Sequence, residues 1–586
     1  MNLLVLALIA AGSQAAPQGP GPSPDSVARL RRTAREAEIR YERLVRRMAP
    51  VRSGGFDGSS CDEIVGRYCL RYDSPDDPVP PDTSEPAVVT DSRRAAIEAL
   101  RSAFSFLPGE FETAGPLVRY LVEDGRSEEA VPAGRLYRAV SGDPVWGPLL
   151  EGFALHAAGE TVAAEAAFDV ALERMDVAQR DRIERIDWLL EPADRTAYRK
   201  LDRAGRRGFE ALFWRMADPL YLTPGNEART EHLARHVWSR ILARGPVVAG
   251  MTSWGTDVEQ LTVRFGTPVT RTRILGRSGG NDAIVEHFDP RHLAYTPQAL
   301  LTAGVPPAPL PGRPWEMARK RTRAGYAAEG VRFVAFLPHQ VSRFPGAGGV
   351  RVRIDAEMAD TVAEEGPPPS AAFWLIDAHG TAVAEGRRAL DPVPGTVHFF
   401  FEADADSGVF TYAVEALDPA GSWAARARYS VDIDPAAAGP RISDPVVLEP
   451  FRGRSRPESR DDPAFRPLAD LTVRRVDTLA VYAEAAALTP GAHARLRLSL
   501  QPASRANLPA RVLGWIGRRI GLSDSRDPVF VEWSEQAGTD GRLVLGFELP
   551  PQPVGDGDHV LITRVTDLAT GRMAESRRII RFAAGS

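Results

Sequence analysis

Apolar residues recur every three or four positions across residues 25–48 and again from residue 91 to residue 244, which predicts amphipathic helices. The apolar stripe of the first helix consists of Val27, Leu30, Ala34, Ala37, Tyr41, Leu44 and Met48. The opposite face is rich in arginine. Because Glu36, Glu38 and Glu42 stand among these arginines, we expect a solvated, ion-paired face, with a membrane-surface helix as the alternative.

Beyond residue 327 the hydrophobic period changes to two, which predicts short strands joined by turns. The strands form two sets, at 327–436 and 440–586. Two β-sandwich modules fit better than one, because a single sandwich does not need about 250 residues. A short amphipathic helix is expected at 508–522. The predicted fold class is multidomain α+β, with an N-terminal α-helical region, a small α/β module and two C-terminal antiparallel β-sandwich modules.

Turn-forming residues suggest the domain boundaries. At 586 residues the chain is too long for one hydrophobic core. Stretches rich in proline predict connectors at 74–90 and 304–326. Between and around them we expect a first segment at 25–73, which contains the first helix and both cysteines, helical repeats at 91–205 and the small module at 206–303.

A 34-residue spacing appears within 91–205. It separates Gly125 from Gly159 and links the series Ala96, Ala130 and Ala164. Residues 151–172 resemble a tetratricopeptide (TPR) repeat at Gly152, Gly159, Ala164, Phe168 and Ala171. Small residues at these positions let two antiparallel helices approach closely, and repeats of this kind typically present a concave peptide-binding face. An ordinary bundle of helical hairpins is the alternative. The middle unit matches poorly, with Gly134 where an aromatic residue belongs.

Residues 253–268 combine a Trp-Gly-Thr-Asp sequence, an alternating stretch and a Gly-Thr-Pro turn. Leu261, Val263 and Phe265 alternate with polar residues, which predicts a strand with one core face. A second strand is expected at 282–288.

This stretch resembles the signature of bacterial GWxTD-domain proteins. The matching residues are Trp254, Gly255, Thr256, Asp257, Phe265, Gly266 and Pro268. Ser253 replaces the first glycine of the signature, and Val269 stands where an acidic residue is common. The resemblance implies a cell-envelope protein of unassigned activity.

Two interpretations of Asp257 remain open. In the first it accepts hydrogen bonds from backbone amides at a sharp corner, with Trp254 packed over it. In the second it is a catalytic carboxylate, but a single carboxylate without a visible partner is weak support for acid–base chemistry. We prefer the corner.

The best enzymatic candidates lie just upstream. His232 and His236 are four residues apart and share one face of a predicted helix, as metal-binding histidines do, and Glu231 precedes them. Leu233 stands where the H-E-x-x-H motif of metalloproteases has its catalytic glutamate. We therefore assign no metal and no cofactor, and regard ion pairs on the helix as the simpler explanation.

The N-terminus predicts export. An apolar run from Leu3 to Ala11 is followed by Ser13-Gln14-Ala15, which fits a signal-peptidase site and a signal peptide at 1–15. No later stretch reaches the roughly 18 apolar residues of a transmembrane helix. In an oxidising compartment, Cys61 and Cys69, the two cysteines of the chain, are expected to form a disulfide.

Charge and motifs narrow the function. A net charge of -5 and a pI near 6.1 disfavour a nucleic-acid partner. We expect an exported scaffold or binding protein with a protein or peptide partner, located in the periplasm, on the cell surface or in the medium. The alternative is an envelope hydrolase or metal-dependent enzyme that uses Asp257, Glu231, His232 or His236.

Overall fold

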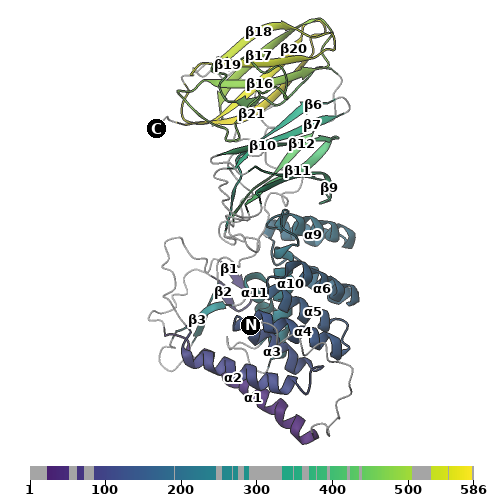
Figure 1. The fold of residues 1–586 in the computed structure, drawn as a ribbon, viewed down its shortest axis with the longest axis vertical. Coiled ribbons are helices and arrows are strands. Elements are labelled where there is room, and N and C mark those ends of the chain that lie inside the picture. Colours follow the sequence, from purple (N-terminus) through teal and green to yellow (C-terminus); the bar gives the residue numbers. More distant parts are fainter. Residues whose placement is uncertain are drawn as a thin grey trace. The chain divides into compact units, whose positions relative to one another are not determined.

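The structure is a computed structural model. It describes residues 23–51, 63–70, 85–190, 192–245, 254–266, 268–274, 283–288, 333–346, 349–358, 368–377, 379–391, 396–418, 423–433, 439–453, 455–503, 529–551 and 554–583. The chain forms two compact units (Figure 1). Unit 1 comprises residues 1–189 and 225–294, and unit 2 comprises residues 190–224 and 295–586. The predicted signal peptide, Cys61, the 304–326 connector and the helix at 508–522 lie outside the described residues.

Unit 1 is mainly helical. Its helices are α1 (Pro24–Met48), α2 (Ala87–Phe104), α3 (Phe111–Glu123), α4 (Ser127–Ser141), α5 (Trp146–Ala157), α6 (Thr161–Arg174), α7 (Val177–Glu184), α10 (Glu227–Arg244) and α11 (Thr256–Phe265). Local signals set several of their ends: the side chains of Ser23, Asp176 and Asn226 cap the N-termini of α1, α7 and α10. Helix α2 begins four residues earlier than the sequence predicts. Pro86 occupies the N-cap position, and the side chain of Val89 in the first turn is buried in the core.

Consecutive helices from α1 to α6 pack against one another around one apolar core. Glycines bring some of them close together. A Cβ atom on Gly134 of α4 would lie 3.1 Å from the Cα of Glu151 in α5, and one on Gly152 of α5 would lie 2.7 Å from the ring of Phe168 in α6. The glycine that departs from the repeat pattern at 134 therefore serves a close helix crossing.

Helix α10 packs against α3, α5 and α6. Its residues Leu233, Val237 and Ile241 are buried in the same core. The ring of Trp238 meets Phe153 edge-to-face at 5.4 Å, and the guanidinium of Arg244 stacks over Phe111 and Trp146 near the starts of α3 and α5. Helix α10 is thus an integral part of the helical core.

Two short antiparallel hairpins complete unit 1. One joins β1 (Glu63–Val65) to β2 (Tyr68–Leu70), and the other joins β3 (Pro268–Ile274) to β4 (Ala283–Phe288). The second contains the strand predicted at 282–288.

Unit 2 contains α8 (Pro192–Lys200), α9 (Arg203–Ala217) and two pairs of sheets. Sheet pair 1 consists of a sheet ordered β10-β7-β6 and a sheet ordered β5-β12-β11-β8-β9. The two sheets share one core that includes Ile354, Phe373, Phe401, Tyr412 and Val431. Its strands are β5 (Phe333–Phe336), β6 (His339–Pro345), β7 (Val350–Met358), β8 (Ser370–Ile376), β9 (Ala382–Ala389), β10 (Val397–Ala405), β11 (Gly408–Asp418) and β12 (Trp423–Ile433).

Sheet pair 2 has the same plan. One sheet contains β13 (Arg441–Ile442), β14 (Val446–Leu448), β16 (Leu479–Ala486) and β19 (Leu543–Leu549); the other is ordered β15 (Thr472–Arg474), β21 (Met573–Ala583), β20 (Gly557–Asp567), β17 (His493–Pro502) and β18 (Val529–Gln536). Val481, Leu498, Leu561 and Ile580 bring side chains from both sheets into one core. Pairing is antiparallel except between β5 and β12 and between β15 and β21. A helical region followed by mostly antiparallel sheets makes the chain α+β, as the period change predicts.

Residues 206–224 correct one predicted boundary. The sequence places them with the small module, but Met216 and Tyr221 pack on Trp374 and its neighbours in sheet pair 1. Tyr221 meets Trp374 edge-to-face at 5.1 Å. The prediction failed because these apolar side chains have helical spacing, which does not identify the surface that buries them.

The crowding at Gly152 gives a stability prediction. Gly152→Ala should destabilise unit 1 by roughly 1–3 kcal/mol, because the Phe168 ring is fully buried and has little room to move away from a new methyl group. Gly208→Ala in α9 is the control, since its Cβ would meet nothing within 4 Å, and it should be neutral or stabilising. Denaturant unfolding of both variants measures the difference. A Gly152→Ala protein as stable as the parent would refute the close α5–α6 contact.

Candidate functional site

The segment that carries the Trp-Gly-Thr-Asp sequence is a helix, so the strand predicted at 261–265 is wrong. Helix α11 begins at Thr256, directly after Gly255, and stops before Gly266, which has a φ of 75°. Leu261 and Phe265 lie one turn apart and pack on Val65 and Tyr68 of the β1–β2 hairpin. Val263 is buried, but so are the polar residues Thr262 and Arg264. The alternation of apolar and polar residues therefore does not separate a core face from a solvent face.

Asp257 lies in the first turn of α11 and binds the turn of the hairpin. Its Oδ2 accepts hydrogen bonds from the Arg67 backbone amide at 3.2 Å and from Arg67 Nε at 2.6 Å. Its Oδ1 accepts from Arg67 Nη2 at 2.8 Å and from the Val258 amide at 2.9 Å. The sequence reasoning anticipated backbone amides as donors, but not the guanidinium from a hairpin 190 residues earlier.

The environment keeps Asp257 ionised. The hydrogen bonds from the Arg67 side chain hold the pKa of the carboxyl well below its usual range. Gly66 makes the close approach possible, because it adopts a φ of 55° and any Cβ there would lie 2.4 Å from the Asp257 Cβ. A carboxylate fixed in this way serves as an anchor for the hairpin and is a poor proton acceptor.

Other residues of the motif support the same junction. The Arg264 guanidinium binds the Glu63 carboxylate through two contacts, at 2.8 and 2.9 Å. Trp254, which a corner of this kind would bury, is only partly buried and is not part of the cluster that Leu261 and Phe265 form with the hairpin. The side chain of Cys69 is outside the described part of β2, as is Cys61, so the predicted disulfide is not tested.

His232 and His236 lie on α10 but face the interior. His232 Nε2 donates to the Ile183 carbonyl at 3.0 Å, and burial lowers its pKa to about 4. His236 lies parallel to Trp188 at 6.4 Å between ring centres, and burial and the neighbouring His232 hold its pKa far below the usual value. Both imidazoles are therefore neutral at physiological pH.

Glu231 is engaged elsewhere. Its two oxygens contact His156 Nε2 at 2.6 Å and Arg235 Nε at 2.5 Å. Among the described residues, no three His, Cys, Asp or Glu side chains are grouped so that they could hold a metal ion.

A cleft of about 410 Å³ lies between α1, α2, α3, α10, α11 and the β3–β4 hairpin of unit 1. Its lining includes none of the four predicted catalytic candidates. Instead it includes carboxylates and arginines from α1, from α2 and the residues just before it, and from α3, namely Glu42, Glu85, Arg93, Arg119 and Glu123. Sequence reasoning missed this cluster, because its members are spread over separate helices.

Arg119 is the centre of the cluster. Its guanidinium binds Glu42 and Glu123, both at 2.7 Å, and Glu42 also accepts a hydrogen bond from the Tyr120 hydroxyl at 3.0 Å. Glu38 is buried nearby, and the charges of Arg119, Glu42 and Glu123 influence its pKa. Glu38 and Glu42 were expected on the ion-paired surface of α1, and this expectation is wrong. They lie one turn apart beside Ala34 and Tyr41, on the side of the helix that the protein covers.

Glu38 yields a pH-dependent prediction. Burial raises its pKa to about 7, so the folded protein binds this proton more tightly than the unfolded chain. Stability should fall as pH rises from about 4.5 to about 7, and Glu38→Gln should remove that loss. The variant should be more stable than the parent by up to about 3 kcal/mol at pH 8, with little gain at pH 4.5. Glu36→Gln on the exposed face of α1 is the control. A pH-independent difference would contradict the shifted pKa of Glu38.

The anchor at Asp257 can be tested by hydrogen exchange. Asp257→Asn and Arg67→Ala should each speed exchange of the β1–β2 amides about two- to five-fold, because a partly exposed ion pair is lost. The double variant should show no further increase. In the parent, this protection should begin to fall as pH drops below about 4, where the carboxyl of the open hairpin takes up a proton, and should be gone once the lowered pKa of the folded state is reached. Unchanged hairpin exchange in Asp257→Asn would contradict the anchoring role.

Comparisons with known proteins place the chain in no family. No family model and no curated protein matches it. A DUF4785 family protein from Legionella pneumophila aligns at 10% identity and a TM-score of 0.15, over 42% of this chain and 56% of that one. A Salmonella alpha-2-macroglobulin aligns at 9% identity and 0.15, over 43% and 16%, and an ICAM-5 ectodomain fragment at 14% and 0.13, over 42% and 54%. Each alignment spans less than two thirds of the other protein, and scores this low establish no shared fold.

Proposed function

We propose that the protein is an exported scaffold or protein-interaction protein of the bacterial cell envelope. The observation that carries this proposal is the use of buried charge in unit 2. Its most deeply buried ion pair joins α9 to sheet pair 1, and buried polar clusters join the two sheet pairs. Such junctions hold neighbouring modules in a fixed arrangement, as a spacer or a scaffold that presents a binding surface requires.

The first junction fixes α9 to sheet pair 1. Arg428 and Glu415 form an ion pair at 2.5 Å with side chains that are 3% and 0% exposed. Arg428 also donates to the carbonyls of Met216 and Asp218, at 3.1 and 2.6 Å, and Glu415 accepts from the Leu222 amide at 3.1 Å. Because desolvated charges are costly without such partners, the segment after α9 is held in one position on the sheet.

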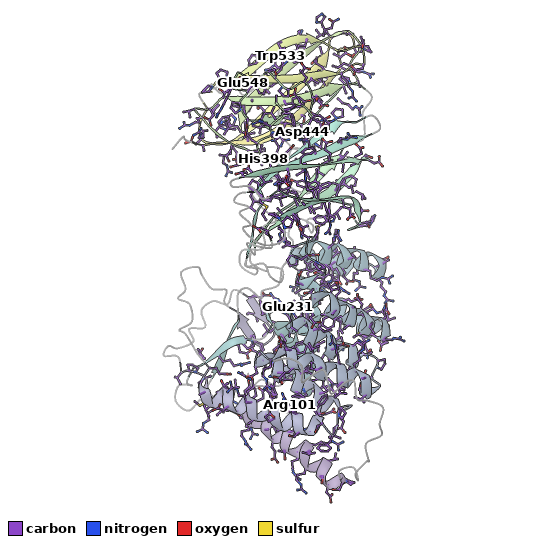
Figure 2. The ribbon with its side chains drawn as sticks, viewed as in Figure 1. Arg101, Glu231, His398, Asp444, Trp533 and Glu548 are labelled. Atoms are coloured by element: carbon purple, nitrogen blue, oxygen red, sulfur yellow. The ribbon has the colours of Figure 1, made fainter. Side chains whose placement is uncertain are left out.

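The second junction joins the two sheet pairs. Gln340 of β6 is fully buried and exchanges hydrogen bonds with the backbone of Val447 at 2.8 and 3.0 Å. Arg343 of β6 binds both oxygens of Asp444, labelled in Figure 2, at 2.8 and 2.9 Å. Arg578 of β21 donates to the Val341 carbonyl at 2.6 Å and to the Ser342 hydroxyl at 2.8 Å.

The charges at this junction remain ionised. Burial acts to raise the pKa of Asp444, but Arg343, Arg578 and Ser576 keep it below its ordinary value. Burial lowers the pKa of Arg578 only to about 10. At neutral pH the junction is therefore held by charge-assisted hydrogen bonds, which are stronger and more directional than apolar contact.

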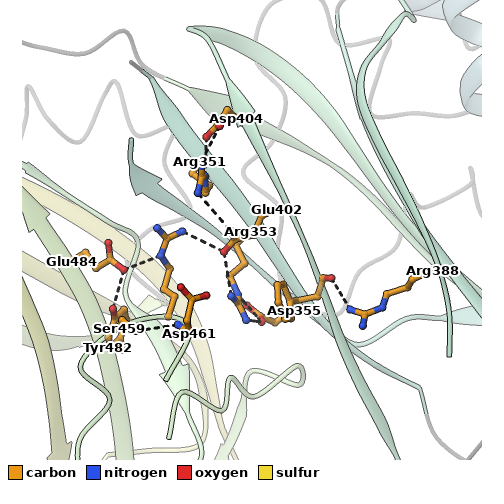
Figure 3. Close-up of polar contacts among 12 residues, drawn as sticks. Arg351, Arg353, Asp355, Arg388, Glu402, Asp404, Ser459, Asp461, Tyr482 and Glu484 are labelled. Carbon is orange, nitrogen blue, oxygen red and sulfur yellow. Dashed lines mark hydrogen bonds and ion pairs between the residues drawn. The ribbon is translucent and has the colours of Figure 1, made fainter. Parts of the chain in front are cut away.

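A further ion-pair network crosses the same junction (Figure 3). Glu402 of β10 contacts Arg353 of β7 at 3.2 Å and Arg460, which precedes β15, at 3.3 Å. Arg460 continues to Glu484 of β16 at 2.9 Å. Phe344 adds apolar contact with Val446 and Tyr482. The two sheet pairs, which we interpret as β-sandwich modules, would thus be presented as one block.

The helical unit supports a more specific proposal. We interpret the pairs α3–α4 and α5–α6 as TPR-like, on the close contacts made by Gly134 and Gly152. The first helices of such pairs usually form the peptide-binding face. Here α10 packs on both α3 and α5, so part of that face is already used within the chain. A peptide partner would have to bind beside α10 or replace it.

Three features of the sequence support the proposed location in the cell envelope. They are the apolar N-terminal run, the resemblance to GWxTD-domain proteins and the expected Cys61–Cys69 disulfide. Among the described residues, no helix is both long and apolar enough to cross a membrane.

The function can be tested in cells that export the tagged chain. The proposal expects a mature N-terminus at Ala16, an envelope or extracellular location, and a reproducible cross-link from a photoreactive residue on the surface of one unit to one specific protein. A chain that keeps residues 1–15 and stays in the cytoplasm would refute the export. Exported protein without any specific cross-link from either unit would refute the scaffold.

The junction predicts a narrow distance distribution between spin labels at Val383 and Met573, exposed sites on the two sheet pairs. Asp444→Ala should broaden it, because Arg343 loses its carboxylate and Arg578 keeps a buried charge without that acid, at a cost of about 3 kcal/mol or more. Asp477→Ala is the control, since its pair with Arg474 lies on the surface. Double electron–electron resonance measures the distance distribution in the parent and in both variants. A distribution already broad in the parent would contradict a single block.

A further inference from the structure

Helix α1 separates its charges between its two sides. Glu38 and Glu42 are only 5% and 1% exposed, and Glu42 is bound by Arg119 and Tyr120. Two of the three glutamates that the sequence placed among the arginines are therefore withdrawn from the surface. The exposed acids of the helix are Asp25 and Glu36.

Five arginines form one row on the exposed side of α1, namely Arg29, Arg32, Arg40, Arg43 and Arg47. Their spacings of three, four and eight residues return each side chain to the same face of a helix. Glu36 occupies the gap in the middle. Arg31, which pairs with Glu110, lies off this row, and the five arginines make no ion pair with any residue that the structure describes.

The row is long and is bordered by apolar side chains. The 18 positions from Arg29 to Arg47 correspond to roughly 27 Å along the helix. Ile39 and Leu44 are partly buried and flank the row. Together with Glu36, Arg40, Arg43 and Arg47 they line a shallow hollow of about 570 Å³. The face therefore combines guanidinium groups with nearby apolar side chains.

We propose that this arginine row of α1 binds the anionic headgroups of a phospholipid bilayer, with the helix lying flat on the membrane surface. A guanidinium group offers paired N–H donors that match phosphate oxygens. Clusters of four to eight basic residues on an amphipathic helix are sufficient to attract anionic lipid, and flanking apolar side chains gain contact with the interface.

The alternative anionic partner is a nucleic acid, and two observations favour lipid. Ile39 and Leu44 beside the arginines gain nothing from a sugar–phosphate backbone. The chain as a whole carries a net charge of -5, which opposes a polyanion that wraps the protein. A membrane bound by this row lies against the α1 face, and charges farther than about 10 Å from it are screened at ordinary salt. The inference does not depend on the proposed scaffold function.

Vesicle co-sedimentation of the full chain tests this inference, with residues 1–15 treated identically in every variant. The protein should bind phosphatidylcholine vesicles that contain about 30% phosphatidylglycerol, but not pure phosphatidylcholine. Binding should fall steeply between about 0.05 and 0.5 M salt. The triple variant Arg40→Gln, Arg43→Gln, Arg47→Gln should lower the partition coefficient at least about tenfold. Glutamine is a good helix former, and hydrogen exchange of α1 checks that the helix stays docked.

The matched control is Arg94→Gln, Arg207→Gln, Arg542→Gln, which removes the same charge from exposed positions elsewhere. Its partition coefficient should stay within about twofold of the parent. An equal loss in both triple variants would show a net-charge effect and overturn the assignment to α1. So would equal binding to neutral vesicles, or no binding to anionic vesicles at low salt. Tighter binding to duplex DNA than to the anionic vesicles would identify a different partner and overturn the lipid proposal.

Discussion

A guanidinium group removed from water must be surrounded by oxygen atoms, and this constraint governs how both units pack. Arg119 in unit 1 and Arg428 and Arg578 in unit 2 are all buried. Each is bound by acceptors that come from different secondary-structure elements. Because an unpaired buried charge costs several kcal/mol, the elements that supply the oxygens cannot shift independently. The buried arginines thus define the neighbours of α1, α9 and β6.

The same constraint explains the asymmetry of α1. The glutamates on its inner side are needed near Arg119, so they are unavailable to neutralise the arginines outside. The helix is therefore acidic towards the core and basic towards solvent. The structural role of Arg119 and the basic surface of α1 are two consequences of one arrangement.

The motif at 254–268 shows how a dense sequence signature can be structural. Asp257 and Arg264 bind Arg67 and Glu63 at the two ends of one small hairpin. The residues between them pack on that hairpin through Leu261 and Phe265. Together these contacts connect two segments that are almost 200 residues apart in the chain. Helix α10 also has a structural role. It packs on α3 and α5, whose surfaces would otherwise be available to a partner.

The sequence alone determined the change from helical to strand periodicity, the first helix, the helical character of residues 91–244, the hairpin strand near 282–288 and the mixed α+β class. These features depend on local spacing and on capping residues such as Ser23 and Asn226, whose effects act within one or two turns. Only the tertiary structure decided that 256–265 is a helix, because an alternating pattern such as Leu261, Val263 and Phe265 also suits a short helix buried on all sides. It also decided that Glu38 and Glu42 point inward and that 206–224 belongs with sheet pair 1. In each case the deciding partner, whether Val65, Arg119 or Trp374, lies more than 35 positions away, and local periodicity carries no information about such contacts.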